Sequence, residues 1–299
     1  MLDYAALSAL AAVVQEGSFE RAARTLHVTP SAVSQRIRLL EERLGCALVV
    51  RDHPCRATEA GQRLCRHVDQ VRLLEHALHG ALPALAPAPE ARVRLPVAVN
   101  ADSLATWFMP AVAAFAAQAP VLLDVQVDDQ EHTAERLRSG AVLAAVTARA
   151  QPVVGCNTRP LGEMRYLAVA TPTFVARHFA GGVGAASLAR APSLMFSLKD
   201  DLQTQWVRRL CRREVELPRH MLPSTQAFVD AALGDMGWGL HPQALIAPLL
   251  AAGRLVELVP DSPLDVPLHW QHARAASALI DGLSGAVLAA ASTALLPPS

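Results

Sequence analysis

The side chains with the clearest capacity for chemistry in this sequence lie between residues 29 and 38. They are short polar groups and basic groups. Thr29 and Pro30 pair an N-cap hydroxyl with a proline at the first helical position, which predicts that a helix begins here and runs to Gly45. The first half of this helix contains no carboxylate. Its short polar and basic side chains are of the types that hydrogen-bond to base edges in the major groove of DNA. They are Ser31, Ser34, Gln35, Arg36 and Arg38.

The elements that would position this polar face are two short helices separated by a tight break near Val28. Apolar residues recur at three- and four-residue steps on both sides of the break, so each helix has one buried face. These positions are Phe19, Ala22, Ala23 and Leu26 in the first helix and Val33, Ile37, Leu40 and Leu44 in the second. Two such helices fit a helix-turn-helix DNA reader. The alternative is an ordinary helical hairpin with a solvated face, and the clustered polar residues favour DNA binding.

Residues 5–51 resemble the LysR-type transcriptional regulators, chiefly through SAVSQ at 31–35 and LLEERLG at 39–45. The resemblance extends along the whole chain and narrows to the arginine- and lysine-responsive ArgP/LysG branch, also called IciA. RDHP at 51–54, TEAG at 58–61 and AVNADSLATW at 98–107 carry that narrower match. One departure is Val49, where most members of the family have phenylalanine.

The resemblance implies an α/β protein with a winged helix-turn-helix, a long linker helix and a two-lobed, periplasmic-binding-protein-like effector domain. It places Arg51 and Arg56 on a wing that contacts phosphates. It also implies promoter DNA and RNA polymerase as partners, self-association into dimers and tetramers, and a basic amino acid as effector. The expected divisions are 1–58 for the DNA-binding domain, 59–89 for the linker helix and hinge, and 90–299 for the effector domain, with lobe I at about 90–163 and 265–299 and lobe II at about 164–264.

Periodicity supports this division independently. An apolar stripe at steps of three and four predicts a helix from 58 to about 82 that pairs two subunits, and a proline-rich break follows at 83–90. Strands and helices then alternate, which predicts a mostly parallel sheet covered on both faces. The predicted strands are 93–99, 121–127, 142–147, 166–171, 193–196, 238–241 and 266–271, and the predicted helices are 103–117, 132–139, 202–213, 224–233, 275–295 and one beginning at 172.

A small-molecule site is expected where strands end and helices begin, because helix N-termini offer free N–H groups to anions. Two such starts carry hydroxyls, at 100–103 and 223–225, and the resemblance puts them in different lobes. Carboxylates there would bind an ammonium or guanidinium group, and aromatic rings would cover an aliphatic stem. The candidates are Asn100, Asp102, Ser103, Trp107, Asp128, Asp129, Thr147, Phe196, Ser224, Thr225 and Trp270. The alternative is that Asp102 and Ser224 are simply N-caps and Trp107 is core.

Composition excludes several other classes of protein. The 27 basic residues balance 27 acidic ones, so the whole chain is no polyelectrolyte. Residues 1–66 hold nine arginines against seven acidic residues, and a surplus this small predicts that DNA affinity comes from several copies on one site. The five cysteines lack Cys-x-x-Cys spacing, so neither a disulfide framework nor a zinc site is predicted, and no metal or cofactor is expected. No signal peptide or membrane span is evident, which predicts a cytoplasmic, nucleoid-associated protein.

Two other functions fit parts of the sequence. An α/β enzyme fused to a DNA-binding head would need a catalytic motif, and the Gly-x-Ser-x-Gly, His-Glu-x-x-His and dinucleotide fingerprints are missing. An architectural or replication-inhibiting DNA binder would need no effector. The two DNA-binding alternatives are distinguished by whether a small molecule changes the DNA footprint.

Overall fold

The N-terminal head is a helical bundle with a two-stranded wing. The computed structural model describes residues 2–82, 93–119, 121–127, 130–274 and 278–298. Helices α1 (Tyr4–Glu16), α2 (Phe19–Thr25) and α3 (Pro30–Leu44) pack together, and β1 (Val49–Val50) pairs antiparallel with β2 (Arg56–Ala57). Thr29 caps α3 by accepting a hydrogen bond from the Ala32 N–H at 3.2 Å, and Gly45 ends it at φ 69°. The helix-turn-helix prediction is therefore confirmed.

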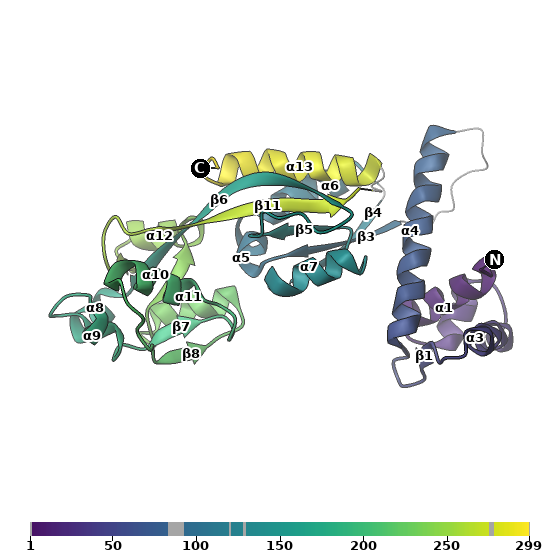
Figure 1. Cartoon of the computed structure of the whole chain (residues 1–299), viewed down its shortest axis with the longest axis horizontal. Helices are drawn as coiled ribbons and strands as arrows, with labels where there is room; N and C mark the ends of the chain where they lie inside the picture. Colours follow the sequence, from purple (N-terminus) through teal and green to yellow (C-terminus); the bar gives the residue numbers. More distant parts are fainter. Residues whose placement is uncertain (1, 83–92, 120, 128–129, 275–277, 299) are drawn as a thin grey trace.

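Helix α4 (Glu59–Ala81) begins directly after the wing and lies beside the C-terminal half of the protein (Figure 1). Thr58 fixes its start, because its hydroxyl donates to the Ala47 carbonyl at 2.8 Å and accepts from the Gly61 N–H at 3.1 Å. Leu64 and Val68 pack on the core of the head, whereas Leu73 joins the core of the C-terminal sheet. One helix is thus anchored in both hydrophobic cores.

Gly61 of α4 lies against Leu48, the residue that precedes the wing strand β1. A Cβ at this position would lie 2.1 Å from the Leu48 carbonyl oxygen, which is backbone and has little room to move. We therefore expect Gly61→Ala to lower the free energy of unfolding of the head by about 1–3 kcal/mol, the usual cost of overpacking. Chemical denaturation followed by circular dichroism would measure it. Gly285→Ala is the matched control, because no atom of the described residues would lie within 4 Å of a Cβ on that helical glycine. Equal losses in both variants would contradict the packing argument.

The sheet of the C-terminal half is mixed, which corrects the expectation of a mostly parallel one. Its order is β10-β6-β11-β5-β3-β4, and β9 also pairs with β6. Strands β3 (Val93–Val99), β4 (Val121–Val127) and β5 (Ala144–Thr147) are parallel, but β11 (Leu264–Ala273) runs antiparallel to β5 and to β6 (Cys156–Ala170). The remaining strands, β9 (Gly239–Pro242) and β10 (Val256–Glu257), pair antiparallel with β6. The chain crosses between lobes once in each direction, so its two crossing strands must oppose each other.

The crossing strands β6 and β11 join two lobes, in agreement with the predicted two-lobed architecture (Figure 1). Lobe I contains α5 (Ala101–Ser103), a π-helical turn at Leu104–Phe108, α6 (Met109–Ala116), α7 (Gln130–Arg138) and α13 (Ala278–Ala294). Lobe II contains α8 (Pro172–His178), α9 (Ala185–Leu188), β7 (Ser193–Met195), α10 (Leu202–Cys211), β8 (Arg219–Met221), α11 (Thr225–Leu233) and α12 (Gln243–Ala251). No helix among the described residues is both long and apolar enough to cross a membrane.

Candidate functional site

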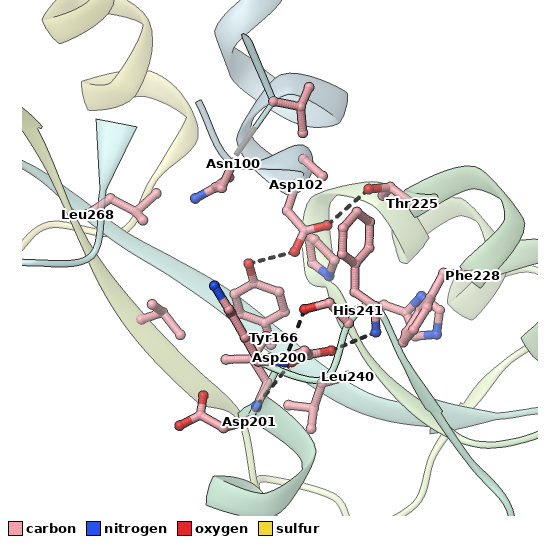
Figure 2. A pocket seen from close by; sticks show the side chains of 18 of the residues that line it. Asn100, Asp102, Tyr166, Asp200, Asp201, Thr225, Phe228, Leu240, His241 and Leu268 are labelled. Carbon is pink, nitrogen blue, oxygen red and sulfur yellow. Dashed lines mark hydrogen bonds between the residues drawn. The ribbon is translucent and has the colours of Figure 1, made fainter. Parts of the chain in front are cut away.

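A cavity of about 440 Å³ lies between the two lobes, beside the strands that join them (Figure 2). Lobe I contributes the start of α5, β6 contributes Tyr166 and β11 contributes Val266 and Leu268. Lobe II contributes the segment between β7 and α10, two residues of α11 and the strand β9. Its volume falls within the range of small-molecule pockets, about 300–1,000 Å³. A ligand held here would contact both lobes and the strands about which they can move.

Asp102 links the two lobes inside this cavity. Its Oδ2 accepts a hydrogen bond from the Tyr166 hydroxyl at 2.8 Å, and its Oδ1 accepts one from the Thr225 hydroxyl at 3.4 Å (Figure 2). Burial raises the pKa of the Asp102 carboxyl, and nearby Asp200 raises it further, while the two hydroxyl donors act in the opposite direction. A partly buried carboxylate of this kind becomes more stable when a cation binds beside it.

The cavity contains further charged side chains, both acidic and basic. Asp200 accepts hydrogen bonds from the Phe196 N–H at 2.9 Å and the Leu202 N–H at 3.2 Å, and burial raises the pKa of its carboxyl. Asp201, Arg149 and Lys199 also line the cavity and are exposed. Three carboxylates therefore face two basic groups, and an occupant with one net positive charge would balance them.

Apolar and neutral groups form the rest of the lining. Phe196, Phe228 and Leu240 belong to lobe II, and Leu268 approaches from β11. His241 is buried, and that burial lowers its pKa to about 3. This imidazole is consequently neutral at ordinary pH and does not repel a cationic ligand.

In the head, the polar side of α3 faces outward. Ser31, Gln35 and Arg38 are exposed, and their spacing together with Ser34 gives the i, i+3, i+4, i+7 pattern of one helical face. Arg36 is half-buried, because its position in the helix turns it toward the flank of the buried face. Arg38 is paired with Glu42, at 2.9 Å between Nε and Oε1. The exposed face is open to a partner such as DNA.

The wing is held to α3 and α2 by a chain of polar contacts. Glu41 of α3 accepts hydrogen bonds from the N–H groups of Leu48, at 2.7 Å, and Val49, at 3.3 Å. Its second oxygen lies 4.0 Å from the Arg51 guanidinium, which is stacked over the Phe19 ring at 5.2 Å from the centroid. Arg56 stands exposed on β2. The wing and the polar face of α3 are therefore fixed relative to each other.

Family models match both halves of this architecture. Residues 4–62 match the bacterial regulatory helix-turn-helix protein of the lysR family, and residues 88–292 match the LysR substrate binding domain. The chain belongs to the LysR family. Within the described residues of this LysR-family chain, no three His, Cys, Asp or Glu side chains are grouped so that they could hold a metal ion.

The relatives of this LysR-family chain are regulators of the predicted branch. The HTH-type transcriptional regulator LysG of Mycobacterium tuberculosis (strain ATCC 25618 / H37Rv) is 49% identical over 97% of this chain and 94% of that protein. The structure of ArgP from Mycobacterium tuberculosis has a TM-score of 0.81 at 47% identity, with all of both chains covered. A full-length LysG from Corynebacterium glutamicum with bound effector Arg has a TM-score of 0.69 at 37% identity, covering 99% of this chain and 100% of that chain.

Four of the residues singled out from the sequence line the cavity, namely Asn100, Asp102, Phe196 and Thr225. Ser224 is exposed and caps α11 by accepting from the Ala227 N–H at 3.3 Å, so it fits the capping alternative. Asp128 and Asp129 lie outside the described residues.

The remaining predicted residues are placed in the core. The Ser103 hydroxyl is fully buried and has no hydrogen-bond partner among the described residues, and Thr147 is buried in β5 with its oxygen accepting from the Arg149 N–H at 3.1 Å. Trp107 is buried and does not line the cavity, and the Trp270 indole donates to the Ser284 hydroxyl at 2.8 Å inside the core. Trp107 and Trp270 thus serve packing, whereas the cavity wall is formed by other aromatic residues, Tyr166, Phe196 and Phe228.

Several cavity residues escaped sequence reasoning, above all Tyr166, Arg149, Asp200 and His241. Asp200 carried a usable signal, because it follows a predicted strand and precedes a predicted helix. The other three lie on strands or loops whose neighbours are set by pairing across the sheet, so nothing in their local sequence marks them.

The contacts of Glu41 yield a prediction for the wing of this LysR-family head. We expect Glu41→Gln to weaken DNA binding about fivefold, roughly 1 kcal/mol, because the charged acceptor that orients Leu48, Val49 and Arg51 is lost. Fluorescence anisotropy with a labelled operator would measure the change. Glu20→Gln is the matched control, since Glu20 is an exposed carboxylate of the head that accepts a hydrogen bond from the Ser18 hydroxyl and does not orient the wing. Equal effects of the two variants would show that charge, and not wing position, matters.

Proposed function

We propose that this LysR-family chain is a DNA-binding transcription regulator whose output is controlled by a basic amino acid, L-arginine or L-lysine, bound between the lobes. The supporting observation is the charge pattern of the cavity, three carboxylates against two basic groups. A basic amino acid carries one carboxylate and two cationic groups, so its charges complement that set. The arginine bound to the related Corynebacterium glutamicum LysG supports the same choice of effector.

The ligand's charged groups can be assigned by sign. Asp102 and Asp200 would receive the cationic groups, and Arg149 would receive the α-carboxylate. Phe196 and Leu268 would cover the aliphatic stem. Because the Asp102 carboxylate already bonds to groups of both lobes, a ligand on it favours one lobe arrangement over others, which is the differential binding that allostery requires.

DNA recognition in this proposal uses the exposed side of α3 and the wing. Thr29 and Pro30 set the start of the helix, and the polar residues of its first half enter the major groove. Arg51 and Arg56 hold backbone phosphates. The base-facing set is Ser31, Ser34, Gln35, Arg36 and Arg38.

We also propose the predicted division of the chain at residues 58 and 89, with α4 as a dimerising helix. Two dimers would form a tetramer on promoter DNA in the nucleoid, where a change of subunit arrangement alters contacts with RNA polymerase. Self-association places two heads on one operator, which offsets the weak net charge of each.

Calorimetry would test the effector, with L-arginine and L-lysine against L-citrulline, which replaces the guanidinium by a neutral group of similar shape. We expect saturable heat with a basic amino acid and none with citrulline. A gel shift of DNA upstream of the gene, with and without the same ligands, would then test regulation. A gel shift that does not change at saturating ligand would favour an architectural DNA binder instead.

A further inference from the structure

A second hollow, of about 300 Å³, lies where the linker helix meets lobe I. Its walls come from α4 and from the end of α7, which are far apart in the sequence. Figure 1 shows α4 standing beside lobe I. The lining residues are Arg63, Arg66, His67, Gln70, Glu135, Arg138 and Ser139.

The spacing of these residues explains why they converge. Residues 63, 66, 67 and 70 follow the i, i+3, i+4, i+7 pattern, so all four lie on one face of α4. Residues 135, 138 and 139 repeat the i, i+3, i+4 part of that pattern at the end of α7. Two helices therefore present one polar stripe each to the same space.

The two walls are held at a fixed separation. Gln70 reaches so close to Gly140 that a Cβ on this glycine would lie 2.9 Å from the Gln70 Nε2. Gly140 has φ 69°, a conformation that favours glycine. Three residues further along α4, Leu73 is buried against the sheet of lobe I. The hollow is thus bounded by packed contacts on both sides.

The charges in the hollow are mainly positive. It contains three guanidinium groups and one carboxylate, that of Glu135, which pairs with Arg138. Arg63 is paired at 2.8 Å with Glu59, outside the hollow. Arg66 is half-buried, and among the described residues no carboxylate lies within ion-pair distance of it. Like charges gathered in this way repel each other, and an anion between them would remove that cost.

We propose that this hollow binds a phosphate group and so ties the linker helix to lobe I. A phosphate offers several acceptor oxygens, which suit the planar donors of arginine and the Gln70 amide and Ser139 hydroxyl nearby. The group is carried either by a small phosphorylated molecule or by the DNA backbone next to the wing. In both cases the occupant bridges the linker helix and the effector domain, independently of the cavity between the lobes.

The test compares Arg66→Gln with Arg72→Gln in the full chain. Arg72 lies on the same helix, outside the hollow, and faces Asp69 at 3.8 Å. Inorganic phosphate and pyrophosphate would be titrated by calorimetry at constant ionic strength, with chloride as the reference anion. We expect saturable binding to the unmodified chain and to Arg72→Gln, and at least about a tenfold loss of affinity in Arg66→Gln. Melting temperatures in chloride would verify that both variants fold.

The slope of DNA affinity against salt separates the two sources of phosphate. If the group belongs to DNA, Arg66→Gln lowers that slope by about one, whereas Arg72→Gln leaves it unchanged. If it belongs to a small molecule, the slope stays the same and only the phosphate titration changes. The proposal is overturned if the unmodified chain binds neither anion and Arg66→Gln leaves the salt slope unchanged, or if the two variants behave alike in both measurements.

Discussion

Asp102→Asn is expected to weaken L-arginine binding by about 2–5 kcal/mol, roughly 30-fold to several thousand-fold. Asparagine keeps the shape of the side chain and can still accept a hydrogen bond from Tyr166, but it carries no charge. The cationic group of the ligand would then be desolvated without its partner. Calorimetry gives the affinity, and a promoter fusion should lose its response to arginine in the same variant.

Asp281→Asn is the control for this prediction, because Asp281 is an exposed aspartate on α13, away from the cavity. It should bind arginine as the unmodified chain does. Normal arginine affinity in Asp102→Asn would remove this carboxylate from the proposed site while leaving the phosphate proposal untouched.

The pH dependence of binding follows from the same carboxyl groups. Burial raises the pKa of both Asp102 and Asp200, and a cationic ligand requires the ionised form. Arginine affinity should therefore be highest above these raised pKa values and fall as the pH is lowered through them. Asp102→Asn should flatten part of this dependence. An affinity that increases on acidification would contradict the assignment.

Leu74→Glu is expected to prevent dimerisation and to weaken operator binding by about 10²- to 10⁴-fold, the scale of avidity that is lost when two heads separate. Leu74, Leu78 and Leu82 are 59%, 49% and 50% exposed and recur every four residues along α4 and its C-cap. Exposure of such an apolar stripe to water is unfavourable, so we expect a second copy of the chain to pack against it. Light scattering would give the mass, and a gel shift the affinity.

Gln62→Glu adds the same charge to an exposed position on another side of α4 and serves as the control. It should remain dimeric. A dimer mass that persists in Leu74→Glu would show that the stripe does not pair the subunits, and the proposed linker role would then be wrong.

Local sequence determined most of the elements of this LysR-family protein. The bounds predicted for the strands at 93–99 and 121–127 are those of β3 and β4, and the Thr29-Pro30 start and Gly45 stop bracket α3 as expected. These features depend on residues within one or two turns of each other, since caps, proline and apolar periodicity act at short range. The helix-turn-helix and its outward polar face follow from such signals alone.

The tertiary structure decided the sheet and the effector cavity. Residues 166–171 read as a short strand, yet β6 extends from Cys156 to Ala170 because it pairs with β11, about a hundred residues away. That pairing makes the sheet mixed and brings Tyr166 to Asp102. It also leaves Trp107 and Trp270 in the core, although their types suited a ligand. Strand register and the relative orientation of the two lobes depend on contacts between residues far apart in the sequence. Local sequence patterns do not encode such contacts.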